Sequence, residues 1–381
     1  MYKYKIAIIT RTKDRPILLE RAINSVLGQT FENWIHVIVN DAGNRPDIEN
    51  LIEKHKDCYG KRVKLIYKNQ SNGMEAASNT GIKDSDSEYI VILDDDDTWE
   101  PDFLGKTVTY LDENPEIGGV MTHSHYVIEK IEENKIQTLY KYPFNTDILN
   151  LNLFDCILKK VYPPTMSFVF RRSCYDELNG FNEEFLKSGD IEFAIRFLTR
   201  FDIDVIPIPL SNVHARPYNQ DICANSSLGN KSYKSNEYWE NKLKNHLLRM
   251  DLKENRVGGG FIYNVLTTLS PLIERNDIEK TLKNCEGKRI ALYGAGIKAG
   301  EFLSSYKEML SNMEIVGILD QNAQKHGAKL NGYTIFPPEK IRNLKPERIL
   351  LTVANTTMVK FFVEDLIKKS GLNVEVLEFM N

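Results

Sequence analysis

The fold of this chain is decided by the stretch Tyr89-Ile-Val-Ile-Leu-Asp94-Asp95-Asp96-Asp97-Thr-Trp-Glu-Pro101. Its first five residues predict a buried strand, and four carboxylates follow at the carboxyl end of that strand. Adjacent carboxylates repel one another, so a solvated acidic run is the ordinary alternative. Directly behind an apolar strand, however, such a cluster suits a hard divalent cation, Mn²⁺ or Mg²⁺, that also holds phosphate oxygens. A cation there would neutralise a diphosphate leaving group.

Short apolar runs alternate with helical patterns on both sides of this stretch. We expect strands over residues 5–10, 34–40, 63–68 and 89–93, and helices over 17–29, 48–56 and 74–83. Strand–helix alternation implies parallel crossovers, so the expected fold class is α/β with a doubly wound, mostly parallel sheet. Ligands of such sheets bind outside the carboxyl ends of the strands. The candidate site residues therefore follow the strands, at Thr10-Arg11, Asn40-Asp41, Asn69–Gly73 and Asp94–Asp97.

The remainder of the chain is less regular at first and then returns to a strand–helix order. In the middle we expect helices over 101–113, 173–179 and 190–200, a loop that enters a strand after 162, and a strand over 204–208. A helical arm follows, and a second small α/β unit has strands over 290–293, 315–319, 349–353 and 374–379 with helices over 297–310 and 358–369. The expected domains are 1–225, 226–284 (the helical connector) and 285–381.

Six ordered motifs carry a resemblance to a known family: Ile6–Pro16, Leu18–Phe31, Val37–Asp41, Asn72–Gly81, Leu93–Pro101 and Asn179–Glu192. Together they resemble the family 2 glycosyltransferases of the GT-A fold. The resemblance implies an inverting, metal-dependent enzyme that uses a nucleotide-sugar donor, in most relatives a UDP-sugar. The implied acceptor is a hydroxyl of a bacterial surface glycan or of a lipid-linked glycan.

The resemblance implies a set of donor-binding residues. Asp41 matches the aspartate that reads the base of the nucleotide, since a carboxylate accepts the imide N–H of uracil. Thr10 and Arg11 lie at the same rim, and Asn72 belongs to the motif that follows the third strand. A turn-capping role for Asp41 before Gly43 remains the alternative.

The same resemblance divides the acidic quartet. Asp96 matches the direct metal ligand, and Asp95 would lie nearer the ribose. The two outer carboxylates, Asp94 and Asp97, would alternatively cap the turn into the helix after Pro101.

Asp190 matches the general base of the family, which takes the proton of the acceptor hydroxyl. The alternative is that Asp190 is only the N-cap of the helix that follows it. Glu192 would contact the acceptor. His214, expected just after a strand, would ligate the metal, and Arg216 would hold phosphate oxygens, although a lone histidine is more often structural.

Three positions depart from the family pattern. Asn40-Asp41-Ala42 replaces the commoner Asp-Asp-Gly, and Ser78 stands where many members have arginine. Gly189 stands where many members have glutamate, so the acidic partner before the general base is missing. This last departure puts the acceptor environment in doubt.

The second α/β unit has a glycine-rich turn between a strand and a helix, with Gly294, Gly296 and Gly300. Such a turn favours a phosphate at the helix N-terminus, and Asp320 ends the next strand, where a ribose-binding acid would lie. The unit resembles Rossmann-like domains of bacterial surface-polysaccharide enzymes. Binding of a nucleotide or nucleotide-sugar and a purely structural role both remain open for it.

Composition excludes several classes. The 381 residues carry a net charge of −4, which disfavours nucleic acid as a partner. Five scattered cysteines predict neither a disulfide framework nor a zinc site, and no signal peptide or spanning segment is expected, which suggests a cytoplasmic protein. Peripheral contact with the inner membrane face and a homo-oligomer remain open. The competing functions are an NAD-dependent sugar-modifying enzyme led by the C-terminal unit and a non-catalytic nucleotide-sugar-binding module.

Overall fold

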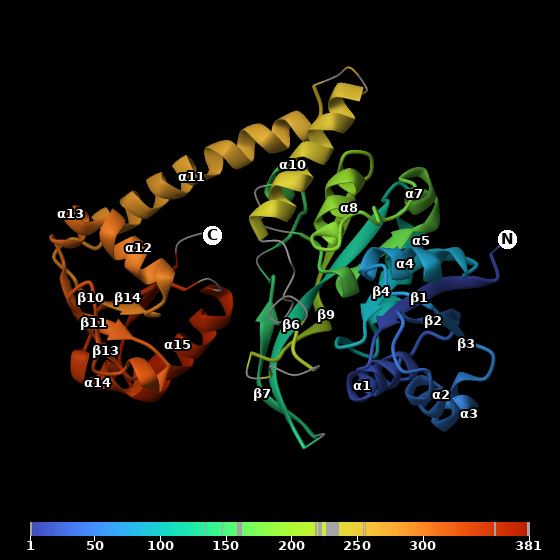
Figure 1. The fold of residues 1–381 in the computed structure, drawn as a ribbon, viewed down its shortest axis with the longest axis horizontal. Coiled ribbons are helices and arrows are strands. Elements are labelled where there is room, and N and C mark those ends of the chain that lie inside the picture. Colours follow the sequence, from blue (N-terminus) through green and yellow to red (C-terminus); the bar gives the residue numbers. More distant parts are fainter. Residues whose placement is uncertain are drawn as a thin grey trace. The chain divides into compact units, whose positions relative to one another are not determined.

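The computed structural model describes residues 2–133, 135–146, 148–157, 162–217, 219, 223–225, 236–253, 255, 257–353 and 356–378, with the backbone alone at 270–274, 356–358 and 361. The chain forms two compact units, Met1–Val265 and Leu266–Asn381 (Figure 1). The boundary falls inside helix α11 (Gly259–Lys283), so the expected connector 226–284 is divided between the two units. Its first ten residues, 226–235, lie outside the described part of the chain.

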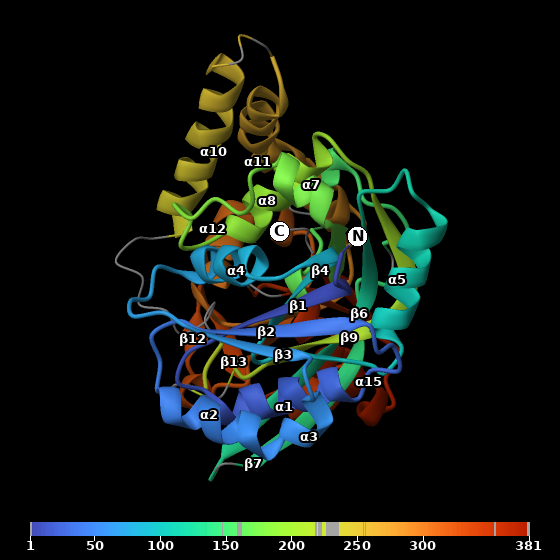
Figure 2. The same ribbon diagram turned by 90° about the vertical axis from the view of Figure 1, so that its right-hand side faces the viewer.

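The first unit is built on a nine-stranded sheet of order β3-β2-β1-β4-β8-β6-β9-β5, with β7 paired to β6. Its parallel half consists of β1 (Tyr4–Thr12), β2 (Trp34–Asn40), β3 (Val63–Tyr67) and β4 (Ser87–Asp94). One face carries α1 (Pro16–Leu27), α2 (Arg45–Lys54) and α3 (Lys56–Tyr59), and the other carries α4 (Met74–Lys83) (Figure 2). These elements confirm the expected α/β fold class.

Two apolar cores lie on the two faces of this sheet. Ile6 and Ile8 of β1 pack with α1 in one core, whereas Ala7 and Ile9 pack with α4 in the other. Successive side chains of a strand point to opposite faces, so a strand covered by helices on both sides is apolar throughout. This is why residues 5–10 form a continuous apolar run.

The other half of the sheet combines two expected strands, β8 (Phe168–Arg171) and β9 (Ile203–Ala215), with three that the sequence pattern did not predict, β5 (Thr98–Trp99), β6 (Gly119–Glu132) and β7 (Lys135–Phe144). The long strand β6 was missed because its buried positions include polar residues: Ser124 is buried and lies 2.8 Å from Ser211 of β9, Oγ to Oγ. β9 is longer than the expected 204–208, so His214 lies inside a strand and not after one.

Five helices complete the described part of the first unit: α5 (Phe103–Glu113), α6 (Leu153–Ile157), α7 (Arg172–Glu177), α8 (Gly189–Leu198) and α10 (Asn236–Lys253). A short 3-10 turn, η1 (Thr165–Ser167), precedes β8. Figure 2 shows α7, α8 and α4 on the same side of the sheet.

The second unit has its own sheet, of order β12-β13-β11-β10-β14-β15. The strands are β10 (Arg289–Tyr293), β11 (Glu314–Leu319), β12 (Lys329–Leu330), β13 (Tyr333–Phe336), β14 (Arg348–Leu351) and β15 (Glu375–Glu378), all parallel except for the β12–β13 pair. Its helices include α12 (Ile297–Ser305), α13 (Lys307–Leu310), α14 (Ile341–Leu344) and α15 (Thr356–Ser370). Strand order reverses at β10, which is the switch point of a doubly wound sheet. Among the described residues, no helix combines the length and the hydropathy needed to span a membrane.

Candidate active site

The candidate site lies at the carboxyl edge of the parallel half-sheet. In the strand register, Arg11 of β1 stands opposite Asp94 of β4, and Thr12 stands opposite Asn40 of β2. The N–H of Asp41 donates to the carbonyl of Thr12 at 2.9 Å. The sheet itself therefore brings the ends of three strands, and the motifs that follow them, to one place.

Each carboxylate of the quartet has a partner from a distant element or a turn. Arg11 Nε lies 2.8 Å from Asp94 Oδ1, and the Thr12 hydroxyl donates to Asp95 Oδ2 at 2.7 Å. Asp97 Oδ1 accepts the backbone N–H of His214 at 2.9 Å. Neither Asp94 nor Asp97 caps α5, whose N-cap residue is Asp102.

Arginines surround the two inner carboxylates. Arg15 pairs with Asp95 and lies 3.5 Å from Asp96, and Arg216 forms an ion pair with Asp96. Burial raises the pKa of Asp95 to about 6, although the charge of Arg15 opposes this shift. Arg216 was expected to hold phosphate oxygens, but its side chain is fully buried and contacts protein carboxylates. The more exposed Arg15 is the cation that faces the rim.

Glu129 of β6 links this cluster to His214. Its Oε1 lies 2.8 Å from Arg216 Nη1, its Oε2 lies 2.9 Å from His214 Nδ1, and Arg21 of α1 also contacts it. Burial opposes ionisation of Glu129, but His214 and Arg21 lower its pKa to about 2. An ionised, fully buried carboxylate in this position fixes the orientation of the imidazole ring. Sequence reasoning missed Glu129 because no motif surrounds it.

The side chains at this edge of the sheet differ in how well they could bind a divalent cation. Among the described residues, no group of three or more His, Cys, Asp or Glu side chains is arranged to hold a metal. A Mg²⁺-type cation nevertheless needs only one or two carboxylates when substrate phosphates and water complete its shell. Asp96 fits this mode better than Asp95, because 13% of its side chain is exposed whereas that of Asp95 is fully buried. His214 fits only if the Thr98 hydroxyl, now 2.9 Å from its Nε2, turns away.

Asp41 lies in a polar pocket at the end of β2. Its Oδ1 lies 2.8 Å from Lys68 Nζ, and its Oδ2 accepts the hydroxyl of Ser71 at 2.5 Å. The turn at Gly43 is closed instead by Asn40, whose Oδ1 accepts the Gly43 N–H at 2.7 Å. The turn-capping alternative for Asp41 is therefore wrong.

Two further donor-side expectations have different outcomes. Thr10 is fully buried, and its hydroxyl lies 2.8 Å from His36 Nε2 inside the sheet, so it does not line the rim. The β1 side chains that contact the quartet are those of Arg11, which pairs with Asp94, and Thr12, which donates to Asp95. Asn72 is exposed in the loop before α4, next to Gly73, whose φ is +100°. An added Cβ at Gly73 would lie 2.7 Å from Leu186 Cδ2, so this loop touches the segment before α8.

Asp190 is the second residue of α8, and the N-cap position is taken by Ser188. The alternative that Asp190 is the N-cap is therefore wrong. Burial raises the pKa of Asp190, while the backbone N–H of Ile191 and the charge of Arg11 oppose the shift. Its electrostatic contact with Arg11 and Asp94 places it beside the quartet. A small cavity lined largely by aromatic rings adjoins it: Phe168, Phe170, Phe181 and Phe193.

Glu192 does not face an acceptor in this structure. It is fully buried, and both carboxylate oxygens contact Arg196, with Nε–Oε1 at 2.6 Å and Nη2–Oε2 at 2.8 Å. His246 of α10 lies 3.1 Å from the same Oε1. These contacts give Glu192 a role in holding α8 and α10 together.

The glycine-rich turn of the second unit is closed by its own aspartate. Asp320 Oδ2 accepts the N–H of Ala295 at 2.6 Å, and Oδ1 accepts the N–H of Asn322 at 2.8 Å. Gly294 has φ +103°, and an added Cβ would lie 2.3 Å from Val353. At Gly296 an added Cβ would meet open space, and Gly300 lies within α12. Gly294 is thus required by the fold, and Asp320 contacts the turn backbone where a ribose was expected.

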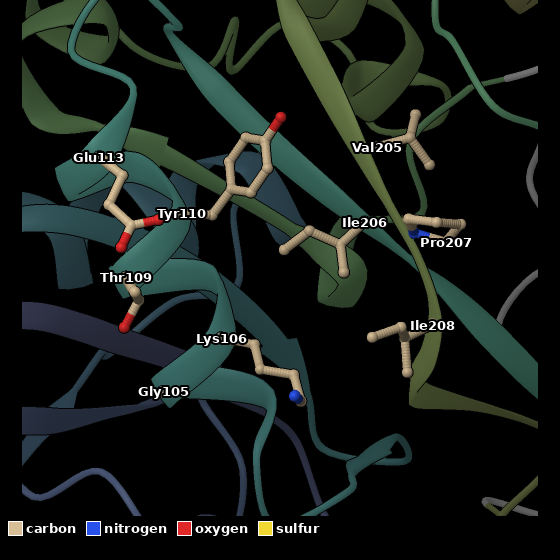
Figure 3. A pocket seen from close by; sticks show the side chains of 9 residues that line it. All are labelled: Gly105, Lys106, Thr109, Tyr110, Glu113, Val205, Ile206, Pro207 and Ile208. Atoms are coloured by element: carbon tan, nitrogen blue, oxygen red, sulfur yellow. The ribbon is translucent and has the colours of Figure 1, made fainter.

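A separate hollow of about 370 Å³ lies between α5 and β9. Figure 3 shows Tyr110 and Lys106 of α5 facing Ile206 and Ile208 of β9 across it. None of its lining residues belongs to the carboxyl edge, so it is not part of the candidate active site.

Comparison with known proteins adds a family and a fold. Residues 7–177 match glycosyl transferase family 2, and residues 286–371 match the family described as C2185-like, N-terminal. An uncharacterized glycosyltransferase of Haemophilus influenzae is 32% identical over 135 residues, which are 35% of this chain and 51% of that protein. Bacillus subtilis TuaG, provisionally named a teichuronic acid biosynthesis glycosyltransferase, is 28% identical over 113 residues, 29% of this chain and 43% of that protein. The chain thus spans about half the length of these two relatives.

Among solved structures, Staphylococcus aureus TarS 1–349 in complex with UDP-GlcNAc has a TM-score of 0.51 at 16% identity, over 64% of this chain and 66% of that one. This likeness concerns the fold alone, which is that of the GT-A glycosyltransferases. The family match includes Asp41 and Asp96 but ends before Asp190. Over residues 7–177 the chain matches glycosyl transferase family 2, on a fold of the GT-A glycosyltransferases.

Proposed function

We propose that this chain is an inverting glycosyltransferase that moves a sugar from a nucleotide-sugar to a hydroxyl of a glycan acceptor. The observation that carries the proposal is the gathering of three separate acidic motifs at one sheet edge. Asp41, the Asp94–Asp97 quartet and Asp190 come from three different segments and are linked through Arg11 and Thr12. Closely spaced carboxylates repel one another, and here arginines and a hydroxyl hold them together at the edge where doubly wound sheets bind their ligands.

The nucleotide would bind between the ends of β2 and β3. Asp41 accepts a base N–H, and Lys68 and Ser71, which contact its two oxygens, hold the carboxylate in place. The family resemblance and the UDP-GlcNAc named with TarS support a UDP-sugar as the donor. Arg11 and Arg15 supply positive charge to the diphosphate at the adjoining strand end.

Asp96, with His214 as a second ligand, would hold a Mn²⁺ or Mg²⁺ ion that supplies charge neutralisation at the departing diphosphate. In the chain itself, Arg216 balances the Asp96 carboxylate and remains paired to Glu129 when Asp96 turns toward the donor. Glu129 keeps the imidazole of His214 oriented in both situations.

Asp190 would act as the general base. It takes the proton of the acceptor hydroxyl as that oxygen bonds to the anomeric carbon and the bond from this carbon to the phosphate oxygen breaks. Attack and departure on opposite faces give inversion. Burial raises the pKa of Asp190 and makes its carboxylate a stronger base than an exposed one.

The acceptor would approach from the side of Tyr162, an exposed ring within electrostatic reach of Asp190. Aromatic rings pack against the apolar faces of sugars, which supports a glycan in this position. The name of TuaG supports a bacterial surface polymer as the acceptor class.

For the second unit, we favour a structural role over nucleotide binding. Both carboxylate oxygens of Asp320 already accept backbone N–H groups, those of Ala295 and Asn322. Calorimetry on the full chain with NAD and with UDP-sugars tests this assignment. Saturable heat that disappears in Asp320→Ala, with transfer activity intact, would overturn it.

The decisive experiment is release of nucleoside diphosphate from a panel of UDP- and GDP-sugars, with Mn²⁺ or Mg²⁺, in the presence and absence of glycan acceptors. We expect turnover with one donor, loss of transfer in Asp190→Asn and a higher metal requirement in Asp96→Asn. Asp320→Ala serves as the matched control, an acidic strand-end residue in the other unit, and should retain full turnover. Activity that survives both Asp190→Asn and Asp96→Asn would refute the proposed function.

A further inference from the structure

Glu75, the second residue of α4, is a buried carboxyl that the proposed mechanism does not yet use. It is 3% exposed, and its Oε2 has no hydrogen-bond partner among the described residues. Burying a carboxyl without full hydrogen bonding costs free energy. An exposed glutamate at this position would interact equally favourably with the helix N-terminus, so burial brings no gain there. The position therefore calls for a functional reason.

The carboxyl of Glu75 fills the space in front of Asp190. An ideal Cβ added to Gly189 would lie 2.4 Å from Glu75 Oε1 and 2.5 Å from its Cδ. Gly189 has no positive φ, so glycine is needed there for space and not for backbone conformation. A carboxyl from α4 thus occupies the volume that a side chain of residue 189 would occupy, immediately before the general base.

Three charged groups from three elements face Glu75: Arg11 of β1, Asp94 of β4 and Asp190 of α8. Burial raises the pKa of Glu75 to about 7, Arg11 opposes the shift, and both aspartates add to it. Arg11 is itself held by Asp94 at 2.8 Å and by the Ser78 hydroxyl at 3.0 Å. Glu75, Arg11 and Asp190 therefore form one electrostatic group next to the acceptor side of the site.

We propose that Glu75 is a positioning residue for the transfer step: its carboxyl packs against Gly189 at the start of α8 and acts on Asp190 as a charged neighbour. This inference rests on the proposed function, in which Asp190 takes the acceptor proton. Above pH 7, where Glu75 is ionised, its negative charge destabilises the ionised form of Asp190, so Asp190 binds the acceptor proton more strongly. Glu75 thereby supplies from α4 the acidic partner whose place before Asp190 is taken by glycine.

The first test is Glu75→Gln, which removes the charge and keeps the size of the side chain. In full-length protein labelled with ¹³C at aspartate carboxyls, the resonance lost in Asp190→Asn assigns Asp190. Ionisation of Glu75 should add a second step near pH 7 to the Asp190 resonance, and we expect this step to disappear in Glu75→Gln. We expect kcat above pH 7 to fall about tenfold and to lose its pH dependence near 7, with donor affinity unchanged. Glu88→Gln, an exposed carboxyl paired with Lys5, is the matched control.

The second test moves the carboxyl. Glu75→Ala should lose activity, and Glu75→Ala combined with Gly189→Glu should regain at least part of it, because the new carboxyl enters the vacated space. If Glu75→Gln fails to fold, Gly189→Ala replaces it: the added methyl displaces the Glu75 carboxyl without changing any ionisable group, and kcat should fall.

The outcomes separate this inference from the proposed function. An unchanged Asp190 titration in Glu75→Gln, or wild-type kcat in a folded Gly189→Ala, overturns the role of Glu75. Absence of transfer by the wild-type protein overturns the proposed function, while the Asp190 titration still decides whether Glu75 acts on that carboxyl.

Discussion

Asp96 and Asp320 follow buried parallel strands in two different units, and both lie at the carboxyl edge of a doubly wound sheet. The partners of Asp96 and its neighbours come from far along the chain: Arg15, Arg216 and His214. Asp320 instead binds the backbone of residues 295 and 322, within its own turn and the adjoining one. Similar position in a sheet therefore does not give similar chemistry.

The difference lies in what happens when each carboxylate leaves its partners. In the proposed function, Asp96 exchanges Arg216 for a metal ion, and Arg216 stays paired with Glu129. Asp320 would leave backbone N–H groups of a buried turn without acceptors. The proposal therefore assigns partner exchange to the first edge and rigidity to the second.

The largest effect is expected at Asp190, the proposed general base. Asp190→Asn should lower kcat by a factor of about 10²–10⁴, which is the usual contribution of general base catalysis. The measurement is the initial rate of nucleoside diphosphate release at saturating donor and acceptor. A loss confined to donor KM would instead assign Asp190 to donor binding.

The next prediction concerns Arg216, the arginine that pairs with both Asp96 and Glu129. Arg216→Met leaves Asp96 and Glu129 without their shared cation, and loss of one partner of a buried ion pair costs about 3–5 kcal/mol. Urea unfolding followed by Trp fluorescence measures the change. Arg45→Met, at an exposed pair with Glu49, is the control and should change stability by less than about 1 kcal/mol.

The next prediction compares alanine substitutions at two glycines of the second sheet edge, Gly294 and Gly296. Gly294→Ala places a methyl against Val353 at positive φ and should destabilise the second unit by about 1–3 kcal/mol. Gly296→Ala, two residues on and facing open space, should be nearly neutral. Hydrogen exchange in β10 and β14 reports this unit separately. Equal effects of the two substitutions would remove the distinction.

The smallest effect is expected from His36, which is fully buried in the first unit. Burial lowers the pKa of His36 to about 3, where Tyr59 and Thr10 contact its two nitrogens at 2.8 Å. The depressed pKa means that the folded state keeps His36 neutral, while the unfolded chain protonates it near pH 6.5. Stability is therefore present above pH 6.5 and lost below it, by about 1.4 kcal/mol between pH 7.5 and 5.5. His36→Gln should remove this part of the pH dependence, as measured by urea unfolding at both pH values.

The sequence was sufficient for the parts of the fold that rest on apolar periodicity. β1, β2, β4 and their helices have continuous or helical apolar patterns, and the acidic motifs at the strand ends follow from them. β6 escaped prediction because its buried residues include Thr122 and Ser124, whose hydroxyls face Ser211 of β9 and give no apolar signal in the sequence.

The site was less predictable than the fold, because several of its contacts join isolated residues. Glu75 and Glu129 carry no motif, and only the folded chain brings them to Gly189 and His214. Thr10 was misassigned because alternation along β1 turns its side chain toward His36, whereas that of Arg11 points to the opposite face, toward Asp94 and Ser78. The residue types pointed to the proposed chemistry. The direction of each side chain could be known only from the register of the strands.

The contact between Gly73 and Leu186 has a mechanical consequence. A Cβ added at Gly73 would lie 2.7 Å from Leu186 Cδ2, so the loop that carries Asn72 packs closely against the segment that leads into α8. In the proposed function, a movement of this loop on binding of the nucleotide-sugar would displace Leu186, which lies just before Asp190 in the chain.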